Sequence, residues 1–195
     1  MSLPTNPASK SPDPSDRNAI PPDATAPRDA TAPPAAQEPS LRFAWSHPWH
    51  FIALGAGSGA LRPAPGTWGT LFAWGTFVLG SRWWGDPVWA ALILLGLYFG
   101  AWAAQRTGAA LGRADHGAIV IDEIVAFWIV LLLLPKTLAW QAAGFLVFRA
   151  FDILKPPPIR QADRRFKNGI GVMLDDLIAA LYTLLVCALI LRLTR

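Results

Sequence analysis

The stretch that decides the fold is residues 173–193, MLDDLIAALYTLLVCALILRL, where two aspartates precede a long apolar run. A membrane-spanning helix needs about 20 predominantly apolar residues, and this run has that length. Four apolar segments precede it, at residues 68–79, 88–104, 119–134 and 138–153. The segment at 88–104 is also long enough, whereas the first is short and the other two carry charges near one end. The sequence therefore predicts an all-α integral membrane bundle of about five apolar helices.

The composition agrees with a membrane setting. The chain is 53% hydrophobic, its mean hydropathy is +0.33, and its ten tryptophans are of the type that gathers at membrane–water boundaries. The alternative is a soluble bundle whose helices are buried on all sides. We consider it the weaker interpretation, because so small a bundle could hardly bury every face of five such helices.

Charge and cysteine content exclude several classes of function. The net charge of +4 is too weak and too dispersed for a nucleic-acid-binding surface. Cys187 is the single cysteine, which excludes an intramolecular disulfide and a cysteine-based metal site.

The chain divides into two regions of different composition. Residues 1–40 carry ten prolines and almost no large apolar side chain, so we expect a disordered Pro/Ala-rich tail. No signal-peptide-like apolar stretch is visible there. Residues 41–195 are expected to form the membrane-embedded catalytic domain.

The distribution of charges predicts the topology. Alternating passage of five helices places residues 1–66, 105–118 and 155–172 on one side, and these stretches hold 12 of the 17 Lys and Arg residues. The positive-inside rule assigns that side to the cytoplasm. Most acidic residues outside the tail fall in or beside the same loops, so we expect an active site that faces the cytoplasm.

A glycine-rich loop leads into the first apolar segment, GAGSGALRPAPGTWGT at residues 55–70. Glycines let backbone N–H groups approach an anion, and a helix N-terminus favours negative charge. Arg62, Gly66 and Thr67 are therefore candidates for binding a phosphate group. An ordinary Gly/Pro turn is the equally open alternative.

Carboxylates recur at the starts and ends of the apolar segments. Asp122 and Glu123 follow Asp115-His116-Gly117, and Asp175 and Asp176 follow a second glycine turn. A charge at membrane depth costs at least ~2.5 kcal/mol, so it tends to be kept for function. The alternative is an acidic helix start favoured by the helix dipole. His116 is a candidate for phosphate binding or proton transfer.

A third group of charges ends the fourth segment. Arg149, Asp152 and Lys155 are spaced three apart and so lie along one side of a helix, which Pro156 ends. With the two acidic pairs, Asp152 completes a set suited to magnesium, which prefers carboxylate oxygen. The predicted magnesium ligands, for one or two ions, are Asp122, Glu123, Asp152, Asp175 and Asp176.

Taken in order, these motifs resemble those of phosphatidylglycerophosphatase A. The matching pieces are P63xxG66T67xG69, D115H116G117 with D122E123, F148R149xxD152xxK155P156, I159R160xxD163 and G169xG171xM173xD175D176. The resemblance runs from about residue 50 to 182, and the tail lies outside it.

The resemblance implies magnesium-dependent hydrolysis of phosphatidylglycerol phosphate to phosphatidylglycerol and inorganic phosphate, at the cytoplasmic face of a bacterial inner membrane. It implies catalytic roles for the five carboxylates and Lys155. Phosphate binding is assigned to Arg62, Gly66, Thr67, His116, Arg149 and Arg160. Two other classes stay open as alternatives: a CDP-alcohol phosphatidyltransferase-like enzyme, and a non-enzymatic membrane transport or assembly protein.

Two mechanisms are compatible with these residues. In the preferred one, the carboxylates hold magnesium, which polarises phosphate and activates water. In the other, an aspartate attacks phosphorus and forms an aspartyl-phosphate.

Overall fold

The computed structural model describes residues 39–157, 159 and 169–194, and these contain helices and no strand. The prediction of an all-helical chain is confirmed. The predicted tail lies outside the described residues except for its last two, and so does Arg160. Two short helices, α1 (Leu41–Ala44) and α2 (Pro48–Ala53), and a 3-10 segment, η2 (Gly55–Ala60), lead into the longer helices.

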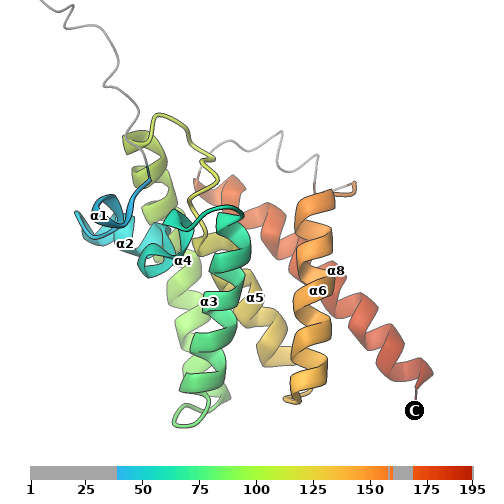
Figure 1. Cartoon of the computed structure of the whole chain (residues 1–195). Coiled ribbons are helices and arrows are strands. Elements are labelled where there is room, and N and C mark those ends of the chain that lie inside the picture. The colour runs from blue at the N-terminus through green and yellow to red at the C-terminus, as the bar shows by residue number, and fades with distance from the viewer. Residues whose placement is uncertain (1–38, 158, 160–168, 195) are drawn as a thin grey trace, which may run out of the picture. The chain divides into compact units, whose positions relative to one another are not determined.

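Five longer helices form the body of the molecule. They are α3 (Pro65–Gly80), α4 (Asp86–Ala110), α5 (Ile121–Leu133), α6 (Leu138–Leu154) and α8 (Gly169–Leu193). The shortest of them, α5, runs through the middle and contacts α3, α4, α6 and α8 (Figure 1). Most of its apolar side chains are buried, and Phe127 and Val130 are fully so.

Local sequence explains where these helices begin and end. Proline stands at the start of α3, where its fixed φ and missing N–H cost nothing. The Thr137 side chain accepts a hydrogen bond from the backbone N–H of Trp140 and caps α6. At the other end of α6, Lys155 takes a left-handed conformation (φ 41°) directly before Pro156, so the helix stops there.

Small residues bring the helices close together. A Cβ atom on Gly169 of α8 would lie 2.0 Å from the backbone oxygen of Ala101 in α4, and one on Gly96 would lie 2.7 Å from Val125 in α5. Such close approach is how helices associate where lipid removes the hydrophobic driving force between them. The packing is therefore of the kind found in membrane bundles.

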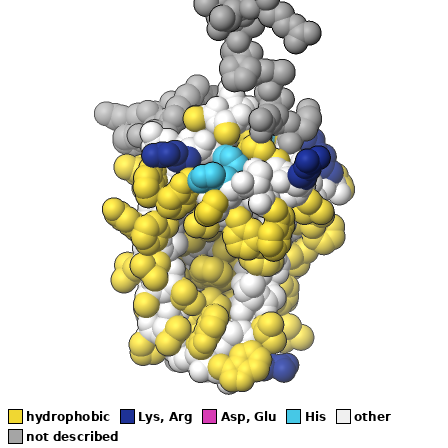
Figure 2. Space-filling model, turned by 90° about the vertical axis from the view of Figure 1, so that its left-hand side faces the viewer, with side chains coloured by type: hydrophobic (Ala, Val, Ile, Leu, Met, Phe, Trp, Pro, Cys, Tyr) yellow, Lys and Arg dark blue, Asp and Glu magenta, His cyan; other side chains and the backbone are white. Residues whose placement is uncertain are grey.

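Two helices, α4 and α8, are long and apolar enough to cross a membrane. These are the two segments for which the sequence predicts full spans. Only 28% of the apolar 18-residue stretch of α4, and 33% of that of α8, is buried inside the molecule. The core helix of a soluble protein is mostly buried. Hydrophobic side chains cover most of the face that includes α4 (Figure 2). Basic and histidine side chains gather near the upper end of this face. These observations support a membrane location.

The glycines at residues 55–59 serve this packing. Gly55 and Gly57 have positive φ values of 52° and 103°, which glycine adopts at little cost. A Cβ on Gly59 would lie 2.0 Å from the backbone oxygen of Ala118, and one on Gly55 would lie 2.3 Å from Ile124. The part of the predicted phosphate loop before Arg62 is thus explained by its contact with the start of α5.

Candidate active site

Four helix ends meet at one end of the bundle and carry the predicted site residues. The starts of α3, α5 and α8 lie near the last turn of α6 (Figure 1). Asp122 and Glu123 occupy the first turn of α5, and Asp175 and Asp176 lie in the second turn of α8. Segments far apart in the sequence therefore bring their charges to one place.

Three carboxylates form a cluster within this site. Asp122, Glu123 and Asp176 each offer an oxygen, and these oxygens lie within 4.8 Å of one another. Asp122 and Asp176 are buried, and the side chain of Glu123 is 13% exposed. We call these three residues the carboxylate cluster.

The carboxylate cluster fits a bound divalent cation. Asp122 Oδ1, Glu123 Oε2 and Asp176 Oδ2 are buried and have no hydrogen-bond partner among the described residues. Three carboxylates this close repel one another strongly away from bulk water. Hard cations such as magnesium take carboxylate oxygens as ligands, and such an ion would offset the repulsion and satisfy these oxygens.

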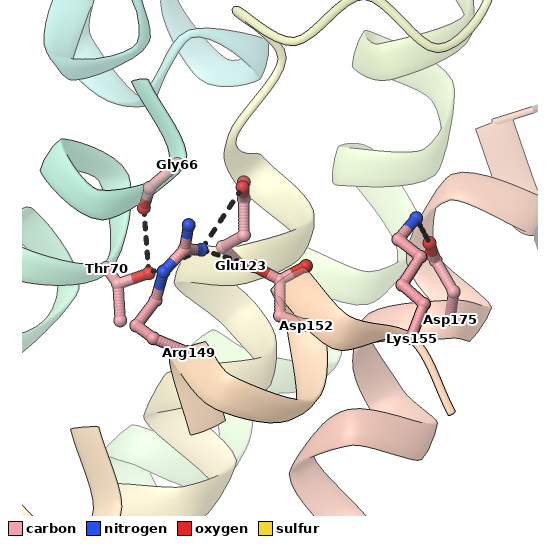
Figure 3. A network of polar contacts seen from close by, with 7 residues as sticks. All are labelled: Gly66, Thr70, Glu123, Arg149, Asp152, Lys155 and Asp175. Atoms are coloured by element: carbon pink, nitrogen blue, oxygen red, sulfur yellow. Dashed lines mark hydrogen bonds and ion pairs between the residues drawn. The ribbon is translucent and has the colours of Figure 1, made fainter. Parts of the chain in front are cut away.

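Arg149 links the carboxylate cluster to α3 (Figure 3). Its Nη1 donates to Asp152 Oδ2 one turn further along α6 and lies 3.7 Å from Glu123 Oε1. The same nitrogen donates to Thr70 Oγ1 at 3.5 Å. With a side chain only 13% exposed, Arg149 is a positive charge held in place by contacts to three helices.

Gly66 makes this arrangement possible. A Cβ atom on Gly66 would lie 2.2 Å from Glu123 Oε1 and 3.0 Å from Arg149 Nη1. Any larger residue would displace one or both groups. The first turn of α3, and with it the positive end of the helix dipole, therefore lies directly against the charged groups.

A second ion pair borders the site. Lys155 Nζ donates to Asp175 Oδ2 at 2.6 Å and joins the end of α6 to α8 (Figure 3). Of the five carboxylates predicted as magnesium ligands, three form the carboxylate cluster. The other two, Asp152 and Asp175, are paired with Arg149 and Lys155.

Comparison with known proteins identifies the family. The phosphatidylglycerophosphatase A family profile matches residues 51–191, which include all the described site residues. The chain belongs to the phosphatidylglycerophosphatase A family. It is 42% identical over 150 residues to a phosphatidylglycerophosphatase A of Haemophilus influenzae, covering 76% of this chain and 91% of that one. The resemblance inferred from the sequence is confirmed.

Two further relatives extend the comparison. A phosphatidylglycerophosphatase A of Escherichia coli is 39% identical over 142 residues, covering 71% of this chain and 80% of that one. A Bacteroides thetaiotaomicron protein with the provisional name phosphatidylinositol-3-phosphatase is 38% identical over 146 residues, covering 70% and 89%. No solved structure matches this chain.

The remaining predicted phosphate-binding residues surround the site. Thr67 is half-buried in the first turn of α3, and Arg62 is exposed in the segment before it. His116 is half-buried in the loop before α5, where its Nδ1 accepts from the backbone N–H of Ala118 at 3.1 Å. Arg160 belongs to the residues that the structure does not describe.

The two other histidines lie in a separate aromatic group. The His50 ring stacks on Phe43, and its Nδ1 lies 2.9 Å from the Thr107 hydroxyl. Burial lowers the pKa of His50, and the neighbouring His47 lowers it further. His50 thus ties α2 to α4 in this phosphatidylglycerophosphatase A family member.

Sequence reasoning missed Thr70. Thr70 is fully buried, and its Oγ1 donates to the Gly66 carbonyl at 2.8 Å while accepting from Arg149. A threonine one turn after a predicted phosphate-binding glycine was the available signal, because residues four apart share a helix face.

Thr70 provides a prediction. Thr70→Val keeps the shape of the side chain but removes the acceptor for Arg149. We expect phosphatase activity to fall by about tenfold, which corresponds to about 1.4 kcal/mol of activation free energy. Thr70→Ser retains the hydroxyl and should keep most of the activity. Steady-state kinetics on both variants checks this. Equal activities for valine and serine would show that the hydroxyl does not position Arg149.

Proposed function

We propose that this chain hydrolyses phosphatidylglycerol phosphate to phosphatidylglycerol and inorganic phosphate, with magnesium held by the carboxylate cluster. Membership of the phosphatidylglycerophosphatase A family supports the reaction, and two relatives carry that enzyme's name. The observation that carries the magnesium requirement is the cluster of three carboxylates with unsatisfied buried oxygens.

The balance of charge in the site explains why a cation is needed. Five carboxylates lie beside two cations, Arg149 and Lys155, both of which are already paired with aspartates. A phosphate monoester is itself negative and would be repelled by the excess negative charge. Asp122, Glu123 and Asp176 would hold the magnesium ion, which when bound supplies Lewis acidity toward phosphate and water.

The chain's own residues then orient and stabilise the reacting groups. Arg149 is fixed by Thr70 and Asp152, so its guanidinium is available to stabilise charge that develops on the phosphoryl oxygens. Lys155, held by Asp175, supplies a second positive charge on the opposite side. Because Gly66 lets the first turn of α3 lie against the site, the positive end of the α3 dipole can also stabilise the negative phosphate group.

The bond changes are those of a phosphate monoester hydrolysis. The oxygen of water forms a bond to phosphorus and loses a proton, for which the carboxylates are the nearest bases. The bond between phosphorus and the glycerol oxygen breaks, and that oxygen takes up a proton to become a hydroxyl group. Attack by an aspartate instead of water would leave an aspartyl-phosphate, which acid quenching during turnover would trap.

We also propose that the chain is a multi-pass protein of the bacterial inner membrane with this site toward the cytoplasm. In the sequence, alternating passage of the helices assigns 12 of the 17 Lys and Arg residues to one side, as the positive-inside rule requires of the cytoplasmic side. The opposite end carries the exposed Lys136–Asp86 ion pair. In this proposal residues 41–195 are the catalytic domain.

The decisive experiment measures phosphate release from phosphatidylglycerol phosphate by the purified, detergent-solubilised chain. We expect release with magnesium, none with a chelator, and a loss of at least about 100-fold in Asp122→Asn, since that carboxylate belongs to the cation site. Lys136→Gln, at the other end of the bundle, is the control and should be fully active. No release with any divalent metal from folded protein would refute the proposed function.

A further inference from the structure

A groove runs along the outer face where α4 lies beside the start of α8. Its lower part, of about 480 Å³, is lined mainly by apolar side chains that include Tyr98, Trp102 and Ile170. Its upper part, of about 420 Å³, is lined by small residues and by Arg113. Gln105 lines both parts, and the neighbouring residues Ile170 and Gly169 line one part each, so the two parts adjoin. We call this the α4–α8 groove.

The two ends of the α4–α8 groove differ in chemistry. Tyr98 is 73% exposed and Ile170 is 68% exposed, so the lower part presents large apolar surfaces outward. At the border of the lower part, the Arg106 guanidinium lies over the ring of the lining residue Trp102, 5.1 Å from its centroid. Arg113 lines the wall above it. None of the described residues lining either part is acidic.

Helix packing separates this groove from the carboxylate cluster. Between them, α4 and α8 touch at Gly169 and Ala101, where a Cβ would lie 2.0 Å from a backbone oxygen. Below this contact, a Cβ on Gly100 would lie 3.6 Å from the Met173 sulfur. Asp176 is on the buried face of α8, whereas Ile170 is on its exposed face. A molecule in the groove is therefore not in the reaction site.

We propose that the α4–α8 groove binds one anionic glycerophospholipid of the surrounding bilayer, which is not hydrolysed. An acyl chain would lie along Tyr98 and Trp102, and the phosphate would lie between Arg106 and Arg113. Apolar surface at membrane depth with arginines at the headgroup end is complementary to such a lipid in both polarity and charge. This proposal rests on the membrane location and not on the phosphatase reaction.

Native mass spectrometry tests the proposal. The full chain is purified with an equal mixture of phosphatidylglycerol and phosphatidylcholine that have the same acyl chains. We expect one phosphatidylglycerol to be retained per chain in preference to phosphatidylcholine. The double variant Arg106→Gln/Arg113→Gln should retain about tenfold less, because each arginine near the membrane surface contributes to anionic-lipid binding. Equal retention of both lipids by the wild type would overturn the proposal.

Matched variants identify where the lipid binds. Arg82→Gln/Lys136→Gln removes the same charge from the other end of the bundle and should retain the lipid. Ala109→Trp, which fills the upper part of the groove, should lose it.

Phosphatidylglycerol is also the product of the proposed reaction, so Arg149→Met is included. If the Arg149→Met variant loses the retained lipid while the Arg106→Gln/Arg113→Gln variant keeps it, the lipid lies in the reaction site and the proposal is overturned.

Phosphatase activity serves as the check on folding. Arg106 and Arg113 are both exposed, so their variants should hydrolyse detergent-solubilised substrate at the wild-type rate while losing the retained lipid. If the double variant does not fold, Arg113→Gln alone provides the same comparison, with a smaller expected loss. Unchanged lipid retention in a folded Arg113 variant and in Ala109→Trp would refute the assignment.

Discussion

Replacing Arg149 with methionine is expected to lower kcat by about 100- to 1,000-fold, the range found when a preorganised donor to a developing charge is removed. Methionine has a similar length and no charge, so Glu123 and Asp152 lose the cation that lies between them. Turnover of phosphatidylglycerol phosphate by purified variants measures the effect. Because the guanidinium contacts three helices, we expect the largest single loss at this position.

Arg149→Lys separates charge from geometry. Lysine keeps the positive charge but lacks the planar fork that reaches several partners at once. We expect the Arg149→Lys variant to recover part of the substrate binding, measured as KM, but little of kcat. Lys136→Met is the control, since its exposed ion pair with Asp86 should contribute about 1 kcal/mol or less. Near-normal kcat in a folded Arg149→Met variant would remove Arg149 from the mechanism.

The second large effect is expected from one added methyl group. Gly66→Ala places a Cβ where Glu123 Oε1 and the Arg149 guanidinium now lie, at 2.2 and 3.0 Å. One or more of these groups must move by about an ångström, and a displacement of that size can cost about 100-fold in rate. Activity should therefore collapse although alanine is the better helix former.

Gly75→Ala is the matched control in the same helix. A Cβ at Gly75 meets nothing within 4 Å, so this variant should be fully active and slightly more stable. Circular dichroism and thermal unfolding of both variants show whether the fold is kept. If Gly66→Ala is folded and active, the close approach of α3 to Glu123 is not required for the reaction.

The helices of this protein are largely predictable from its sequence because hydrophobic length is a local property. The two long spans follow from their apolar runs alone. That the carboxylates gather at one end also follows, because each lies beside the end of an apolar segment and successive segments run in opposite directions. The boundaries of α3 and α6 are similarly local, since Pro65 and Pro156 constrain them directly.

The pairing of charges inside the site is not predictable in this way. Five carboxylates look equivalent in the sequence, yet the rotation of α5 and α8 brings three together. Asp152 and Arg149 are three residues apart on α6 and pair locally, as their spacing indicates, but the rotation of α6 decides that this pair lies beside Glu123. The left-handed end of α6 at Lys155 and the packing of α6 on α8 bring that side chain to Asp175. These rotations depend on contacts between segments distant in sequence, such as Gly69 against Val120. The role of Thr70 depends on the same contacts.

The short central helix has a consequence for how the enzyme meets its substrate. The Lys136–Asp86 pair brings the far end of α5 close to the start of α4. Starting from the level of this ion pair, the 13 residues of α5 extend about 20 Å along their helix axis, whereas the 25 residues of α4 extend about 38 Å along theirs. A hydrocarbon layer is about 30 Å thick. In the proposed topology, with the ion pair at the opposite boundary of that layer, the carboxylates at the start of α5 would lie beneath its cytoplasmic surface. In that arrangement the headgroup of the lipid would dip inward to react while its acyl chains remain in the leaflet, and the reaction would not require lifting the lipid into water.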